Sequence, residues 1–146
     1  MTQTVGTCSL IIERDIPHAP ELIWRALTES SLLAEWLLKN DFEPVVGHRC
    51  QFRSTPMPQW SGIIDSEVLE VKPHSRLVYS WMPSGGEGHD GPTWVVTFTL
   101  TPTAAGTHLR MEQSGFQSEE GPDYKGAKYG WSNFLNNLDR VVGGLQ

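Results

Sequence analysis

The sequence contains few of the residues from which metal centres, disulfide frameworks and nucleic-acid surfaces are built. Its 146 residues include two cysteines, Cys8 and Cys50, which are too few for a disulfide framework. The histidines do not recur at the spacing of metal ligands, so we expect no metal site and no cofactor. The 11 basic residues are outnumbered by 17 acidic ones and are scattered singly. This distribution argues against nucleic acid as a partner, because phosphate contacts need clustered positive charge.

Long apolar runs are also missing. No window approaches the roughly 20 consecutive apolar residues that a membrane-spanning helix needs, so we expect no membrane insertion. The first residues, MTQTVGTCSLIIERDI, lack a basic leader followed by an apolar stretch, which predicts a cytoplasmic protein with reduced, buried cysteines. Hydrophobic residues make up 38% of the chain and charged residues 19%, as in globular proteins. The length suits a single domain over residues 1–146.

Periodicity predicts one strand at the N-terminus and several more over residues 48–116. The segment CSLIIERDI alternates, with Leu10, Ile12 and Ile16 on one face. Two short helices are expected after it, over ELIWRALTES and SLLAEWLL. Further strands are expected over HRCQFRS, SGIIDSEVLEV, RLVYSWM, TWVVTFTLTP and THLRMEQSGF, which turn signals separate. Connections this short predict antiparallel neighbours.

The segment GWSNFLNNLDRVV near the C-terminus has the spacing of one apolar face on a helix. That face is formed by Trp131, Phe134, Leu135, Leu138, Val141 and Val142. The predicted strands likewise have one apolar face and one polar face, the usual pattern of an antiparallel sheet. We therefore predict an α+β domain in two layers, with a curved antiparallel sheet of about six or seven strands wrapped around this helix.

Five segments resemble segments of a known family. They occur in the same order as in that family and together span nearly the whole chain: IERDIPHAPELIWRALTESSLLAEWL, EPVVGHRCQFR, RLVYSW, VTFTLTPTAAGTHLRMEQSGF and YGWSNFLNNLDRVV. The chain resembles the homologues of the activator of the heat-shock chaperone ATPase, within the SRPBCC or START-like superfamily. This resemblance implies the helix-grip fold, with a deep cavity between the long helix and the sheet. Many relatives carry a histidine before SGF, whereas this chain has Gln113, which argues against proton transfer there.

Six tryptophans are the most unusual feature of the composition. We expect Trp24 and Trp36 to pack the short helices onto the sheet. The other four lie at strand ends or at the start of the long helix, where the mouth of a cavity would lie. Gln113 is the only polar member of its inward-facing set, so its amide needs a partner from the chain, from water or from a ligand.

We predict that a hydrophobic or aromatic small molecule binds in this cavity. The predicted ligand-binding residues are Trp60, Tyr79, Trp81, Trp94, Phe98, Met111, Gln113, Phe116, Trp131, Phe134 and Leu138. The segment QSEEGPDYKGA, just before the long helix, is predicted to be a lid over it.

Two other functions stay open. The first is a co-chaperone-like interaction module whose partner is a heat-shock chaperone. The second is a cyclase-like or aromatase-like enzyme that folds a substrate in the cavity. For each of these functions we expect a monomer or homodimer. We predict no catalytic residues: Asp65, Glu67 and Glu70 form an acidic run typical of a solvated surface, and no G-x-S-x-G motif or phosphate-binding loop accompanies them.

Overall fold

The computed structural model describes residues 8–54, 62–83, 94–116 and 118–145. Along the chain, the elements are β1 (Cys8–Ile16), α1 (Pro20–Thr28), α2 (Ser30–Trp36), β2 (Lys39–Asn40), β3 (Arg49–Arg53), β4 (Ile63–Lys72), β5 (Arg76–Pro83), β6 (Trp94–Thr103), β7 (Gly106–Phe116) and α3 (Pro122–Gly143). The predicted strands and both short helices are confirmed. The two-residue strand β2, which pairs Lys39 with Arg53, was not predicted.

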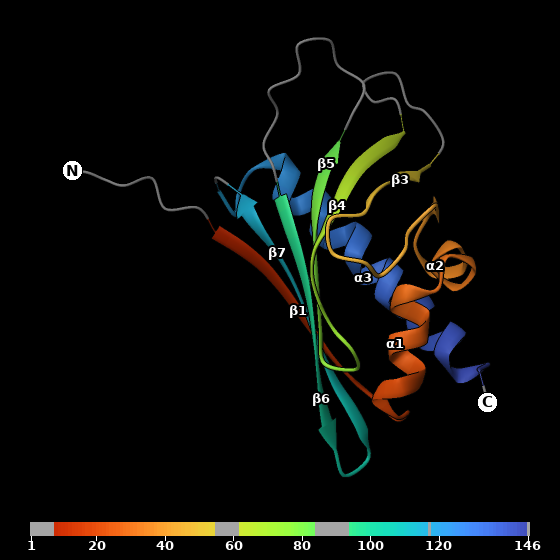
Figure 1. Ribbon diagram of the computed structural model, residues 1–146. Helices are drawn as coiled ribbons and strands as arrows, with labels where there is room; N and C mark the ends of the chain where they lie inside the picture. The colour runs from red at the N-terminus through yellow and green to blue at the C-terminus, as the bar shows by residue number, and fades with distance from the viewer. Residues whose placement is uncertain (1–7, 55–61, 84–93, 117, 146) are drawn as a thin grey trace.

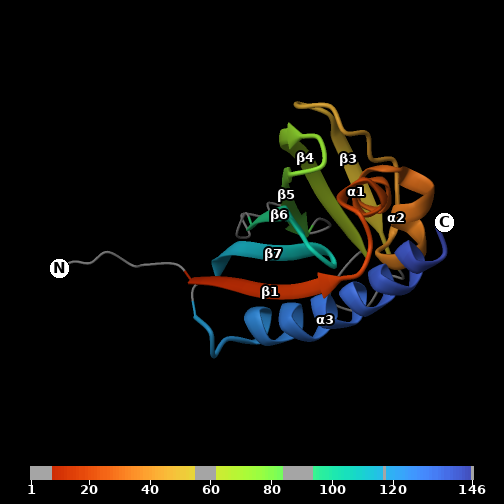
Figure 2. The same ribbon diagram turned by 90° about the horizontal axis from the view of Figure 1, so that it is seen from below.

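The strands form one curved sheet in which every neighbouring pair is antiparallel, in the order β1-β7-β6-β5-β4-β3-β2. Figure 1 shows α3 crossing behind the strands. Figure 2, seen from below, shows α3 running beside β1 and β7, with α1 and α2 next to its C-terminal end. This arrangement confirms the predicted α+β helix-grip fold.

The core lies between the sheet and the helices, and the strand faces are those the alternation predicts. The inward residues of β5, β6 and β7 are all buried: Leu77, Tyr79, Trp81, Trp94, Val96, Phe98, Leu100, Leu109, Met111 and Gln113. The apolar face of α3 packs onto them through Leu135 and Leu138, which are 1% and 0% exposed. Trp24 and Trp36 are also buried, as predicted, and the indole Nε1–H of Trp36 donates to the Ala26 carbonyl oxygen at 2.8 Å.

The long helix begins earlier than its apolar periodicity indicates. Helix α3 starts at Pro122, so the residues PDYKGA are its first turns and the predicted lid is wrong over this half of the segment. Tyr124, in the first turn, packs edge-to-face on Phe116 with the ring centroids 5.3 Å apart. Proline is favoured at the start of a helix because its missing N–H would have no helical partner there. The predicted wall residue Trp60 lies outside the described residues.

Candidate ligand-binding cavity

A cavity of about 250 Å³ lies between the first half of α3 and the adjacent ends of β4, β5, β6 and β7. Its lining residues are Leu38, Ser54, Ile64, Trp81, Trp94, Gln113, Phe116, Gly126, Ala127, Gly130, Trp131 and Phe134. Six of these were predicted from the sequence, so the structure brings six of the 11 predicted residues together around one space. The place of the cavity, between the long helix and the sheet, is the one the resemblance implied.

Strand register places the aromatic walls. Trp81 and Trp94 are directly paired partners on β5 and β6, so their side chains stand side by side on the inward face. Trp81 contacts Trp131 of α3 with centroids 5.4 Å apart, and Trp94 contacts Phe116 of β7 at the same centroid separation. Trp131 in turn packs edge-to-face on Phe134 at 5.6 Å. Aromatic contacts therefore join the sheet to α3 around the cavity.

Gln113 supplies an amide to this wall. It is 2% exposed, and its Oε1 accepts a hydrogen bond of 2.6 Å from the indole Nε1–H of Trp131. The sequence indicated that the buried amide needs a partner, and the structure finds one within the chain. Because this bond joins β7 to α3, it fixes the orientation of Trp131 at the edge of the cavity.

The space itself comes from small residues on α3 that sequence reasoning missed. Gly126, Ala127 and Gly130 line the cavity opposite the aromatic strands. A Cβ atom added at Gly126 would meet nothing within 4 Å, and one added at Gly130 would meet only Phe134 Cε2, at 4.0 Å. The available signal was their spacing: Gly130 follows Gly126 by four residues and Ala127 by three, so it neighbours both on the surface of a helix.

Four predicted residues lie in solid packing instead of the cavity wall. Phe98, Met111, Leu138 and Tyr79 are each 0% exposed and do not line the cavity. Tyr79 stacks among Phe42, Phe52, Trp81 and Phe98, with ring centroids 5.7–6.2 Å apart. Burial raises the pKa of Tyr79 well above its ordinary value, so its phenol is neutral. Alternation identifies the inward face of a strand, but it does not tell which inward residues border a space.

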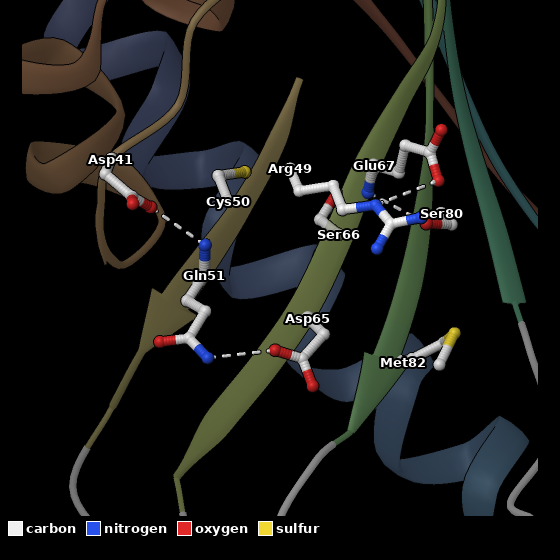
Figure 3. Close-up of a pocket in the computed structure, with 9 residues that line it drawn as sticks. All are labelled: Asp41, Arg49, Cys50, Gln51, Asp65, Ser66, Glu67, Ser80 and Met82. Atoms are coloured by element: carbon white, nitrogen blue, oxygen red, sulfur yellow. Dashed lines mark hydrogen bonds and ion pairs between the residues drawn. The ribbon is translucent and has the colours of Figure 1, made fainter. Parts of the chain in front are cut away.

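A second, larger hollow of about 610 Å³ lies over strands β3, β4 and β5 on the face away from α3 (Figure 3). Its lining residues are Asp41, Arg49, Cys50, Gln51, Asp65, Ser66, Glu67, Ser80 and Met82. The polar groups mostly satisfy one another. Gln51 donates its backbone N–H to Asp41 and its Nε2–H to Asp65 at 2.8 and 3.0 Å, and Arg49 Nε lies 3.7 Å from Glu67 Oε1.

The outer hollow has the character of a surface and offers no activated nucleophile. The Glu67 side chain is 41% exposed, as the predicted solvated face requires. Burial, followed by the nearby negative charge of Asp41, raises the pKa of the Cys50 thiol to about 11, so at neutral pH it is protonated and unreactive. Across the described ranges, no group of three or more His, Cys, Asp or Glu side chains is placed to hold a metal ion.

None of the described helices combines the length and the apolar character that spanning a bilayer demands.

Comparison with models of known families finds one match. The model of the family Activator of Hsp90 ATPase homolog 1-like protein matches residues 17–143. The chain belongs to this family. The family is part of the SRPBCC superfamily, so the resemblance seen in the sequence is confirmed. A search of curated proteins finds no match.

Solved structures agree with the family. Protein MLL2253 from Mesorhizobium loti is 45% identical, with a TM-score of 0.84 over 95% of this chain and 99% of that one. DynU16, a putative protein in the dynemicin biosynthetic locus, is 24% identical, with a TM-score of 0.78 over 93% of this chain and 47% of that one. CalU16 from Micromonospora echinospora is 21% identical, with a TM-score of 0.76 over 99% and 82%. The last two likenesses show the fold alone.

Proposed function

We propose that this member of the family binds a hydrophobic or aromatic small molecule between α3 and the sheet. The observation that carries the proposal is the cavity of about 250 Å³ whose walls include Trp81, Trp94, Phe116, Trp131 and Phe134. Ligand sites are concave and mostly apolar, with a few polar groups that fix orientation. This cavity has that composition: five of its 12 described lining residues are aromatic, and Gln113 contributes an amide.

The chemistry around the cavity favours binding over catalysis. Its described lining contains no acid, base or thiol that could transfer a proton or attack a substrate. Gln113, which stands where many relatives have a histidine, has no titratable group. DynU16 is a putative protein in a biosynthetic locus, which is compatible with a ligand-handling role for this fold.

A thermal-shift and calorimetric panel of flavonoids, fatty acids and aromatic polyketides tests the proposal. A ligand present at 100 times its Kd should stabilise the native protein by about 2.7 kcal/mol if the unfolded chain does not bind it. Ala127→Phe should abolish this gain, because a ring at position 127 fills the cavity. Asn133→Ala, on the exposed side of α3, is the matched control and should keep it. Uniformly flat responses from the wild-type protein would contradict the proposal.

A second candidate function is supported by the family itself, whose description names an activator of the Hsp90 ATPase. In that case the working surface is external and the cavity is incidental. Co-precipitation with a heat-shock chaperone, together with stimulation of its ATPase, would support this function. Ala127→Phe separates the two functions: it should leave chaperone stimulation unchanged while abolishing ligand binding.

A further inference from the structure

The amide of Gln113 has one engaged end and one available end. Its Oε1 accepts the hydrogen bond from Trp131 Nε1–H at 2.6 Å. An indole nitrogen can only donate, so this contact identifies one end of the amide as the oxygen and the other end as the NH₂ group. Among the described residues, no acceptor pairs with that NH₂ group. Its two hydrogens are therefore left for a partner from outside the described chain.

The NH₂ group of Gln113 can be reached from the cavity. In the described ranges, the unpaired side-chain polar atoms that are closed off from solvent, such as Trp94 Nε1 and the Tyr79 hydroxyl, do not include Gln113 Nε2. This nitrogen therefore keeps some accessible surface. The residue is only 2% exposed, and the space beside it is the cavity that it lines. The remaining surface of the NH₂ group thus opens into the cavity.

The polar side chains of the wall can donate hydrogen bonds but can hardly accept them. Among the described lining residues, those with a hydrogen-bonding side chain are Ser54, Trp81, Trp94, Gln113 and Trp131. The three indoles can only donate, and the Gln113 oxygen is already occupied by Trp131. In the described lining, the hydroxyl of Ser54 is therefore the only side-chain group that can still accept.

A wall of this kind favours a ligand that brings an acceptor. Water can complete the Gln113 amide in the free protein, and a ligand that displaces this water loses affinity unless it replaces the acceptor. The oxygens of a carbonyl or a carboxylate do so, whereas an ammonium group has only donors and would face the NH₂ hydrogens. The cavity is open on one side, so a carboxylate can keep part of its hydration and its charge is not excluded.

We propose that the ligand carries a carbonyl or carboxylate oxygen, and that this oxygen accepts a hydrogen bond from Gln113 Nε2–H. This inference rests on the proposed binding function and deepens it. Trp131 is a positioning residue in this arrangement, because its indole holds the amide in the orientation that leaves the NH₂ group to the ligand. Shape and apolar contact come from the aromatic side chains of the wall.

Isosteric ligands test the proposal. The compounds 2-acetylnaphthalene, 2-isopropenylnaphthalene and 1-(2-naphthyl)ethylamine place a carbonyl oxygen, a CH₂ group and an ammonium group at nearly the same position. By calorimetry, the wild-type protein should bind the ketone about fivefold more tightly than the alkene, which corresponds to about 1 kcal/mol. It should bind the amine most weakly. The affinity of 2-naphthoate relative to the ketone then distinguishes a carboxylate ligand from a carbonyl ligand.

The variant Gln113→Glu keeps an oxygen for Trp131 Nε1–H and replaces the NH₂ group by a second oxygen. It should lose the fivefold preference for the ketone and bind the amine more tightly than the alkene. The comparison is made at about pH 9, because burial raises the pKa of a carboxyl group and a protonated one could still donate. Asn133→Asp adds the same charge on the exposed side of α3 and, as the matched control, should keep the wild-type order.

A second readout needs no variant. The side-chain NH₂ resonances of Gln113 in the wild-type protein should move to lower field with the ketone and not with the alkene. They should move in the same direction with any flavonoid or fatty acid of the panel that binds, because each carries a carbonyl or carboxylate oxygen. This measurement decides the matter if Gln113→Glu does not fold.

The outcomes separate this inference from the binding function. Equal binding of ketone and alkene by the wild-type protein would overturn the role of Gln113 and leave the binding function intact. A preference for the ketone that survives in Gln113→Glu at about pH 9 would also overturn it and place the donor elsewhere in the wall. If the naphthalenes do not bind but a larger panel member does, unmoved Gln113 NH₂ resonances in that complex would overturn it. If nothing binds at all, the proposed function itself fails.

Discussion

The two halves of α3 cover the same sheet but leave different interiors beneath them. The second half buries Leu135, Leu138 and Val142, each 1% exposed or less, in the core, and α1 and α2 lie next to its end. The first half presents Gly126, Ala127 and Gly130, and a cavity of about 250 Å³ lies there. Side-chain volume is thus missing from the helix where the cavity lies.

Trp131 marks the boundary between these regions. Its ring lies edge-to-face on Phe98 of the solid region at 5.9 Å, and it also contacts Trp81 in the cavity wall. The hydrogen bond from its Nε1–H to Gln113 holds it in this position. A well-anchored indole can keep a space open beside close-packed core, because its ring cannot rotate into that space without breaking the bond.

The largest expected effect comes from the solid region. Leu135→Ala should lower the free energy of unfolding by about 2–5 kcal/mol, because it leaves a new void among close-packed side chains. Urea unfolding followed by tryptophan fluorescence measures the change. A loss well below this range would show that the packing around Leu135 is as loose as that around the cavity, and the contrast between the two halves would disappear.

A smaller loss is expected at the cavity wall. Phe134 is only partly buried and borders existing space, so Phe134→Ala enlarges a void instead of creating one. Its cost should fall below about 3 kcal/mol, the lower end for truncation of a buried Phe. Asn133→Ala, one residue earlier on the exposed side of the helix, should change stability by no more than about 0.5 kcal/mol under the same conditions. If Phe134→Ala lowers the free energy of unfolding as much as truncation of a fully buried Phe does, then Phe134 lies in close-packed core and does not border a cavity.

The fold could be predicted from the sequence to a large extent because its strands have one buried face and one solvated face. The alternation Trp94, Val96, Phe98, Leu100 identifies the inward side of β6, and each of these residues is buried. Short turn-rich connections then leave antiparallel pairing as the only arrangement. Strand β2 was missed because two residues carry no periodic signal, and pairing with β3 alone determines them.

The extent of α3 and of the cavity was harder to predict for one shared reason. Gly126 and Gly130 disfavour a helix intrinsically, so the sequence around them indicates a loop. The contact of Tyr124 with Phe116 and the packing that follows Trp131 stabilise the helix through this region. The same glycines make the space. The residues that make the start of the helix hard to predict therefore also make the cavity next to it hard to predict.

The smallest expected effect is a gain in stability instead of a loss. It tests directly whether side-chain volume is missing from the first half of α3. Glycine inside a helix costs about 0.5–1 kcal/mol relative to alanine, so Gly130→Ala should raise stability by up to that amount if its methyl group has room. The new Cβ would meet Phe134 Cε2 at 4.0 Å, an ordinary van der Waals distance, and Gly126→Ala would meet nothing within 4 Å. Both variants should therefore gain stability in urea unfolding, while the methyl groups narrow the site and weaken binding of the larger ligands in the panel. A loss of stability in both would show that the space over α3 is already filled, and the cavity could then not be the difference between the two halves of the helix.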